Sequence, residues 1–223
     1  MIEKNLIKRI ITSLILLFVL LSMFLSSTMM ILSSIIISSI TYYEFNRLFY
    51  KIFKKKIFKI IFSGIVLLYL FIFVFIIFFI ESSSNLESNY KLFLFYSILV
   101  SINSDIGGFI IGKFFKGKKL TKISPNKTIS GSAGGFMFSL LTVLVFYKDF
   151  YFMNINFLIV ATLIISFVSQ TGDLIISYLK RLAKLKDTGT ILPGHGGFLD
   201  RIDGILFAAP IGLLLLDKLS LIQ

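Results

Sequence analysis

The sequence contains no cysteine, no tryptophan and a single histidine among its 223 residues. Without cysteine the chain forms neither disulfides nor thiolate metal sites, and one histidine alone does not make a structural zinc site. Acidic residues are also scarce, with 11 against 23 lysines and arginines. A net charge of +12 points to nucleic acid in a soluble protein. In a membrane protein it reports topology and contact with anionic lipid.

Apolar residues fill much of the remaining chain, at 57% of the sequence with a mean hydropathy of +0.94. Soluble domains contain roughly 45–50% apolar residues, so this composition is typical of an integral membrane protein. Crossing ~30 Å of hydrocarbon takes about 20 residues of helix. Seven apolar runs approach that length, at 10–26, 28–45, 57–80, 92–112, 133–147, 155–171 and 205–219. We predict an all-α, polytopic membrane protein with about seven transmembrane helices. We expect residues 1–223 to form a single membrane domain, with N-terminal helices in 1–91, and in 92–223 the helices and cytoplasmic loops that hold the candidate functional residues.

The lysines and arginines predict the orientation of these helices. Three precede the first run, six lie in residues 47–59, six in 113–127 and five in 180–201. Only Lys91, Lys148 and Lys218 fall on the opposite side. Basic residues accumulate in cytoplasmic loops, so we expect the N-terminus and these basic segments in the cytoplasm.

Polar residues interrupt the fourth apolar run at Ser101, Asn103, Ser104 and Asp105. An acid inside a membrane helix marks function by default, because an ionised carboxylate there needs a cation, a cavity or a partner charge. The alternative is a buried polar cluster that joins helices through serine and asparagine.

The following basic segment runs from Lys113 to Ser124-Pro125-Asn126-Lys127-Thr128 and then to Gly131, Gly134 and Gly135. The pattern resembles a phosphate cradle that leads into a helix. Glycines let the backbone approach a ligand, and the lysine and the helix N-terminus add positive charge. It lacks the order of a P-loop.

The sixth run ends near Asp173, and we expect its helix to continue as residues 174–184. Asp173, Ser177, Lys180 or Arg181, and Lys184 then recur at helical spacing, which places an acid, a hydroxyl and cations on one face. An ordinary amphipathic extension with a solvated face would show the same pattern.

A polar segment then joins the last two apolar runs, with three acids at Asp187, Asp200 and Asp203. Its Pro-Gly and Gly-Gly pairs favour turns whose amides can face a ligand. Carboxylates are the hard oxygen ligands that Mg²⁺ prefers, usually one or two of them together with substrate phosphates. His195 has two possible roles: a structural one, in which its hydrogen bond orders this segment, and a catalytic one, as an acid or base.

These segments together resemble the signature of the phosphatidate cytidylyltransferase (CDP-diglyceride synthase) family. The resemblance rests on Ser177-x2-Lys180-Arg181-x4-Lys186-Asp187-x-Gly189-x2-Leu192-Pro193-x-His195-Gly196-Gly197-Phe198-x-Asp200-Arg201-Ile202-Asp203. Asp105, Gly112-Lys113 and Ser124-Pro125-x-Lys127-Thr128 resemble the family's upstream motif in the same order. The chain departs from the pattern at Ser130 and Ile176, where the family usually has glutamate.

The resemblance implies that CTP and phosphatidic acid react to give CDP-diacylglycerol and pyrophosphate, for phospholipid biosynthesis at the cytoplasmic face of the cell (inner) membrane. It also implies Mg²⁺, with a monovalent cation such as K⁺ as a second metal, and a homodimer. No nucleic acid partner is expected.

The resemblance also assigns the site residues. Asp173 and Asp200, supported by Asp203, are the expected metal ligands. The expected catalytic residues are Lys127, Lys180, Arg181, Asp187, His195 and Arg201. The expected substrate-binding residues are Asp105, Lys113, Ser124, Thr128 and Ser177.

Three other functions are alternatives to this one. A CDP-alcohol phosphatidyltransferase also pairs aspartates at a membrane surface, but Asp200 and Asp203 have the wrong spacing for its motif. A small transporter or channel would use Asp105 and Asp173 for ions in broken helices. A lipid-binding scaffold would need the basic loops and not the aspartates.

Overall fold

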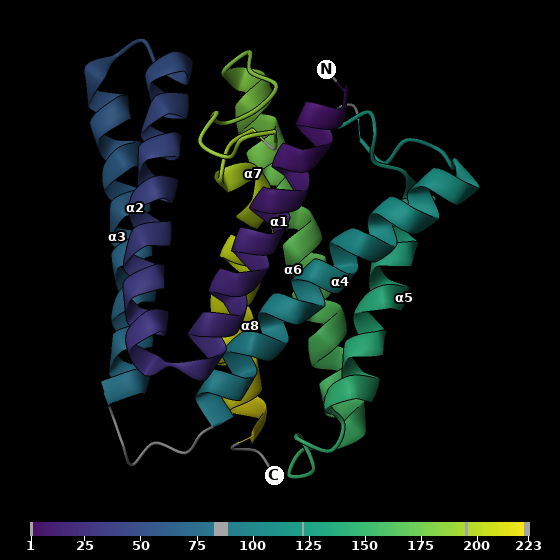
Figure 1. Cartoon of the computed structure of the whole chain (residues 1–223). Coiled ribbons are helices and arrows are strands. Elements are labelled where there is room, and N and C mark those ends of the chain that lie inside the picture. The colour runs from purple at the N-terminus through teal and green to yellow at the C-terminus, as the bar shows by residue number, and fades with distance from the viewer. Residues whose placement is uncertain (1, 83–88, 122, 195, 221–223) are drawn as a thin grey trace. The chain divides into compact units, whose positions relative to one another are not determined.

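The computed structural model describes residues 2–82, 89–121, 123–194 and 196–220. Eight helices make up most of this described part (Figure 1). They are α1 (Ile2–Leu25), α2 (Ser27–Ile52), α3 (Lys56–Ser82), α4 (Asn89–Phe115), α5 (Ile129–Phe146), α6 (Ile155–Leu182), α7 (Leu199–Ile202) and α8 (Ile205–Ser220). The predicted all-α polytopic fold is confirmed, and each of the seven predicted spans coincides with a helix.

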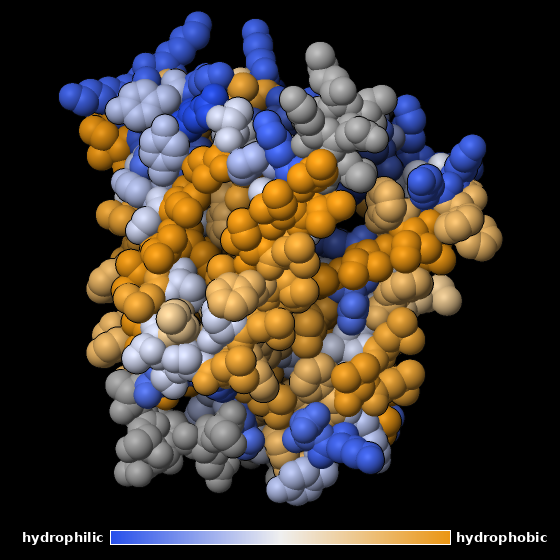
Figure 2. Space-filling view, in the orientation of Figure 1, coloured by the Kyte–Doolittle hydropathy of each residue, from blue (hydrophilic) through white to orange (hydrophobic). Residues whose placement is uncertain are grey.

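Five helices, α2 to α6, are long and apolar enough to cross a membrane by length and composition. The remaining two predicted spans are shorter, since α1 is apolar only over Ile10–Leu25 and α8 has 16 residues. Many large apolar side chains along these helices are exposed, and Figure 2 shows them as orange surface along the helix sides. Such surface suits contact with lipid and would be a liability in water.

The chain divides into two compact units, and residues 179–201 group with the N-terminal helices. The first unit contains Met1–Leu86 and Leu179–Arg201. In it α1 and α2 are separated by Ser26 alone, and α2 packs against α3. Ser63 of α3 donates a hydrogen bond to Asn46 of α2.

The second unit contains Glu87–Tyr178 and Ile202–Gln223. Within it α4 packs along α5 and α8 (Figure 1). Small residues let these helices approach closely: a Cβ on Gly134 would lie 2.8 Å from the Gly107 carbonyl oxygen. Close backbone approach through glycine is a common mode of helix packing in membranes. The prediction of one membrane domain stays a prediction.

Candidate functional site

Lys127 and Asp173 form an ion pair within the second unit. Asp173 lies on α6 and its side chain is 22% exposed, so solvent reaches the pair. Ser177, one turn later on α6, donates to Asp173 Oδ1 over 3.3 Å, as the predicted i, i+4 spacing implies. The structure thus brings three predicted site residues together.

The loop that carries Lys127 is held by its own backbone. The Lys127 amide donates to the Ser124 carbonyl oxygen over 3.0 Å, and the Lys127 carbonyl oxygen accepts from Leu120 over 2.8 Å. Thr128 is the N-cap of α5, and its hydroxyl accepts from the Gly131 amide over 3.0 Å. The predicted loop leading into a helix is confirmed, and Thr128 serves to begin that helix.

The prediction that the glycines after Thr128 admit a ligand is wrong for all three. A Cβ on Gly131 would lie 2.8 Å from the Gly108 carbonyl oxygen, and Gly134 faces Gly107. A Cβ on Gly135 would lie 2.9 Å from Gln170 Nε2. These glycines pack α5 against α4 and α6, so the close approach that they permit is between helices.

The polar residues of α4 resolve into two groups. Ser101 hydrogen bonds to Ser169 over 2.7 Å, Ser104 to Ser166 over 2.9 Å, and the Asn103 amide donates to Thr142 over 2.9 Å. These contacts are the interhelical polar cluster that the alternative interpretation predicts. Asp105 instead lies at an exposed position of α4.

A second ion pair forms within the first unit, between Lys180 Nζ and Asp200 Oδ1 at 2.6 Å. Two amides donate to Asp200 Oδ2, that of Thr188 at 2.8 Å and that of Gly197 at 3.1 Å, and the Thr188 hydroxyl oxygen lies 3.1 Å from the same atom. The Asp200 side chain is 7% exposed. Asp200 is thus held at one oxygen by the α6–α7 loop (residues 183–194 and 196–198) and at the other by a cation.

The α6–α7 loop begins where α6 ends at Leu182, so the predicted continuation to Lys184 is wrong by two residues. Lys184 adopts φ 54° and donates to the Arg181 carbonyl oxygen over 3.0 Å, while Leu185 donates to the Lys180 carbonyl oxygen over 2.9 Å. This pair of bonds is a Schellman motif, which ends a helix with one residue in the left-handed region. Lys184 therefore does not extend the polar face of α6.

Glu44 is a residue that the sequence analysis missed. It lies on α2 inside an apolar run, yet it is 0% exposed. Its carboxylate accepts from the Thr188 hydroxyl at 2.7 Å and from the amides of Phe198 at 3.0 Å and Leu199 at 2.8 Å. The signal that would have found it is the one applied to Asp105, an acid within a membrane helix.

The other predicted residues occupy varied environments. Lys113 is exposed at the end of α4, with its ammonium 5.7 Å from the Phe109 ring centroid. Arg181 and Arg201 are also exposed. Asp187 is exposed, and a Cβ on Gly196, whose φ is 86°, would lie 3.2 Å from the Asp187 Cβ. The prediction for His195 lies outside the described residues.

Asp203 is buried, like the side chain of Asp200 and unlike that of Asp173, but it lies just before the start of α8. It is 8% exposed, and its Oδ1 accepts from the Gly204 amide at 2.9 Å. The Asp203 carbonyl oxygen would lie 3.0 Å from a Cβ on Gly172, so the chain before α8 packs directly on α6. These contacts indicate a structural role at the start of α8.

Ser130 and Ile176, the two positions that depart from the family pattern, lie in different surroundings. Ser130 lies in the first turn of α5, where its hydroxyl accepts from the Gly117 amide at 3.3 Å and contacts the Thr128 hydroxyl at 3.1 Å. Ile176 is fully buried on α6. A serine thus takes part in the polar loop, whereas an isoleucine joins the apolar packing.

The carboxylates of Asp173 and Asp200 are oxygen ligands of the kind that a hard cation prefers. Asp173 and Asp200 each already hold a positive charge, the ammonium of a lysine. Among the described residues, no three Asp, Glu or His side chains gather in a way that could hold a metal ion. A metal at either aspartate would therefore take its other ligands from water or phosphate, which is how Mg²⁺ commonly binds.

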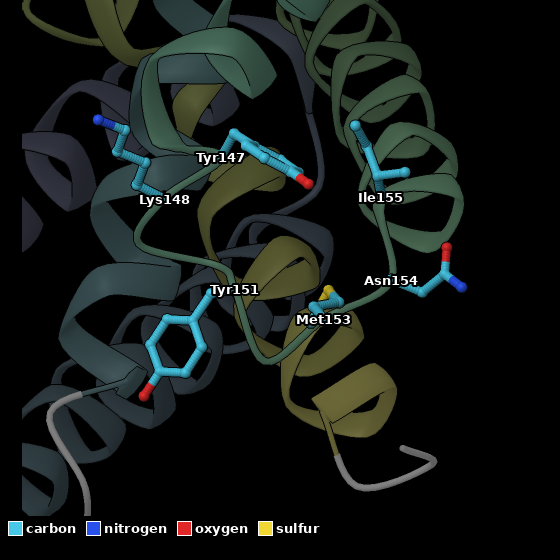
Figure 3. A pocket seen from close by; sticks show the side chains of 6 residues that line it. All are labelled: Tyr147, Lys148, Tyr151, Met153, Asn154 and Ile155. Atoms are coloured by element: carbon cyan, nitrogen blue, oxygen red, sulfur yellow. The ribbon is translucent and has the colours of Figure 1, made fainter.

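A hollow of about 500 Å³ lies elsewhere, at the connection between α5 and α6 (Figure 3). It is lined by Tyr147, Lys148, Tyr151, Met153, Asn154 and Ile155. None of the predicted site residues that the structure describes is among them. The hollow therefore does not identify the predicted site.

Comparison with known proteins shows which family the chain resembles. The model of the cytidylyltransferase family matches residues 2–219. A phosphatidate cytidylyltransferase of Staphylococcus haemolyticus is 43% identical over 130 residues, which are 57% of this chain and 50% of the relative. Phosphatidate cytidylyltransferases of Bacillus subtilis and Rickettsia felis are 40% and 41% identical over 138 and 132 residues. These two matches cover 61% and 56% of this chain, and 51% and 57% of the relatives.

The aligned part thus spans about half the length of these relatives. The family match is much longer, since it includes almost every residue of the chain. The predicted resemblance is confirmed: the chain belongs to the cytidylyltransferase family.

Proposed function

We propose that the chain is a phosphatidate cytidylyltransferase, an enzyme of phospholipid biosynthesis that converts CTP and phosphatidic acid to CDP-diacylglycerol and pyrophosphate. The observation that carries the proposal is the 40–43% identity to relatives of that name over more than half of the chain. The apolar helices agree with a substrate that resides in a membrane. The family match favours this reaction over the transporter and scaffold alternatives.

In the proposed reaction an oxygen of the lipid phosphate attacks the α-phosphorus of CTP. The new bond joins this oxygen to the α-phosphorus, and the bond from the α-phosphorus to the bridging oxygen breaks as pyrophosphate leaves. The nucleophile is already an anion, so no base needs to remove a proton. Catalysis then depends on positioning and on neutralising negative charge.

The two paired lysines are the first choices for that neutralisation. Lys127 and Lys180 each hold an ammonium against a carboxylate, which keeps the charge in place before substrate arrives. Arg181 and Arg201 are exposed, as groups that meet a soluble triphosphate or a lipid phosphate must be. Fixed cations stabilise a phosphoryl transition state most when they need little reorganisation.

We include Mg²⁺ in the proposal, with Asp173 and Asp200 as the residues that would hold it and K⁺ as an additional monovalent cation. When bound, Mg²⁺ would neutralise charge on the triphosphate. Carboxylate oxygens suit it, and both aspartates already attract a cation.

The proposed site faces the cytoplasm from the inner membrane. The basic segments support this orientation, because 20 of the 23 lysines and arginines fall on the side assigned to the cytoplasm. CTP is a cytoplasmic nucleotide, so the orientation gives it access. A homodimer remains part of the proposal through the family resemblance alone.

Purified chain in detergent–lipid micelles provides the test, with radiolabelled CTP and phosphatidic acid as substrates. We expect CDP-diacylglycerol to form with Mg²⁺ and to fall to background when EDTA removes it. Lys127→Gln should lower the rate, while Lys148→Gln, a matched loss of charge in the α5–α6 connection, should leave it unchanged. Wild-type chain that makes no product under these conditions would refute the proposed reaction.

A further inference from the structure

Glu44 is a fully buried acid on a membrane helix that the proposed reaction does not use. Burying an ionised carboxylate is unfavourable by several kcal/mol unless hydrogen bonds or opposite charge compensate it. Three donors approach this carboxylate within 3.0 Å. The hydrogen bonds from these donors therefore compensate the burial of Glu44 within the first unit.

All three donors belong to one distant segment. Phe198 donates to Oε1, whereas Thr188 and Leu199 donate to Oε2, so both carboxylate oxygens are engaged. The donors follow Glu44 by 144, 154 and 155 residues. One side chain of α2 thus fastens both the early part of the α6–α7 loop and the start of α7.

Two glycines let the loop close over the carboxylate. A Cβ on Gly189 would collide with Glu44 Oε1. A Cβ on Gly197 would collide with the Thr188 hydroxyl and lie 2.7 Å from Glu44 Oε2. The close fit indicates that the loop conformation and the position of Glu44 depend on each other.

Thr188 links Glu44 to Asp200. Its hydroxyl oxygen lies 2.7 Å from Glu44 Oε2 and 3.1 Å from Asp200 Oδ2, and its amide donates to the same Asp200 oxygen. Asp200 Oδ2 is thereby fixed on the loop, and Asp200 Oδ1 faces the Lys180 ammonium. A movement of Thr188 would change the direction in which Asp200 presents Oδ1 to a cation, which in this structure is the Lys180 ammonium.

We propose that Glu44 is a positioning residue: by holding Thr188, Phe198 and Leu199, it fixes the orientation in which Asp200 meets a cation. The inference rests on the proposed cytidylyl transfer. Glu44 itself stays clear of substrate. Its contribution to the rate passes through the α6–α7 loop and Asp200.

Steady-state kinetics of four full-length variants test this role. Glu44→Gln keeps the shape but exchanges one acceptor for a donor, and Thr188→Val removes the linking hydroxyl. Each should lower kcat by about tenfold to a hundredfold, the effect expected for one hydrogen bond to a charged group, with less than about threefold change in KM for CTP. Thr188→Ser restores the hydroxyl and should recover most of the rate. Thr41→Val on the same helix should match wild type, since the buried Thr41 hydroxyl donates within its own helix, to the Ile37 carbonyl oxygen.

A double variant separates positioning from a general loss of fold. If Glu44 acts through Asp200, adding Glu44→Gln to Asp200→Asn should lower kcat less than about twofold further, because groups that act as a unit are not additive. Full multiplicative loss in the double variant would overturn the inference. So would a Glu44→Gln enzyme with wild-type kcat.

Hydrogen exchange gives a readout that needs no turnover. The peptide that covers residues 196–202 should exchange at least about tenfold faster in Glu44→Gln, while α2 peptides away from residue 44 stay as in wild type. If wild-type chain makes no product, the proposed reaction fails, and exchange alone then decides whether Glu44 holds the loop. Unchanged exchange at residues 196–202 would overturn the inference whatever the activity.

Discussion

The two aspartate–lysine pairs differ in how the aspartate is held. Asp200 is 7% exposed and, besides its lysine, accepts from two loop amides, with the Thr188 hydroxyl oxygen also within 3.1 Å. Asp173 is 22% exposed, pairs with Lys127 and accepts from the Ser177 hydroxyl at 3.3 Å. One carboxylate is oriented before any ligand binds, whereas the other lies on a helix with few restraints.

This difference indicates a division of labour within the proposed chemistry. A preoriented group contributes to rate because it needs no reorganisation during reaction. A loosely held group exchanges partners more readily, which suits the entry of a metal and a triphosphate. We therefore expect Asp200 to control kcat, and Asp173 to control mainly the concentration of Mg²⁺ that the enzyme needs.

Truncating each aspartate should give the largest effects and separate the two roles. Asp200→Ala should lower kcat on the order of 10³-fold, because it removes a charge and releases the loop donors. Asp173→Ala should lower kcat on the order of tenfold to 10²-fold and raise the Mg²⁺ concentration for half-maximal rate. Product formation at several Mg²⁺ concentrations measures both, and hydrogen exchange should accelerate at residues 196–202 only in Asp200→Ala. Equal kinetic and exchange behaviour of the two variants would contradict the comparison.

Removing the lysines should give smaller effects in the same order. Lys180→Met leaves a buried carboxylate without its cation, which is unfavourable, whereas Lys127→Met uncovers an aspartate that water already reaches. We expect kcat losses of about 10²-fold and about tenfold, respectively. Raising the salt concentration should weaken the more exposed Lys127–Asp173 pair more, so the Lys127→Met defect should shrink at high salt. A Lys180→Met defect that shrinks more than that of Lys127→Met would reverse this ranking.

The helices could be predicted from sequence because long apolar runs indicate membrane-spanning helices. The basic loops between the runs mark where one helix ends and the next begins. The end of α6 could not be predicted, since a lysine in the left-handed region at Lys184 has none of the sequence signal that glycine gives a helix end. The glycines of α5 were misread for a related reason. Close approach selects glycine whether the neighbour is a ligand or another helix, and the sequence does not say which.

The site was predictable where its partners are near in sequence or follow a motif. Asp173 and Ser177 are one helical turn apart, and their contact follows from spacing. Glu44 was missed because its donors lie more than 140 residues away, and periodicity carries no information at that range. An isolated acid in an apolar run was its one visible signal.

For the glycines that let the loop close, we expect an effect no larger than that of Lys127→Met. Gly197→Ala would place a Cβ against the Thr188 hydroxyl and 2.6 Å from the Gly189 amide nitrogen, so the loop must shift. We expect about tenfold lower kcat, since a small misplacement of the reacting groups is enough for losses of that order. Gly64→Ala on α3 is the matched control, because a Cβ there meets nothing within 4 Å and should leave kcat within about twofold. If both alanine variants keep the wild-type rate, the loop tolerates displacement. Preorientation of Asp200 would then not explain why Asp200 affects kcat more than Asp173 does.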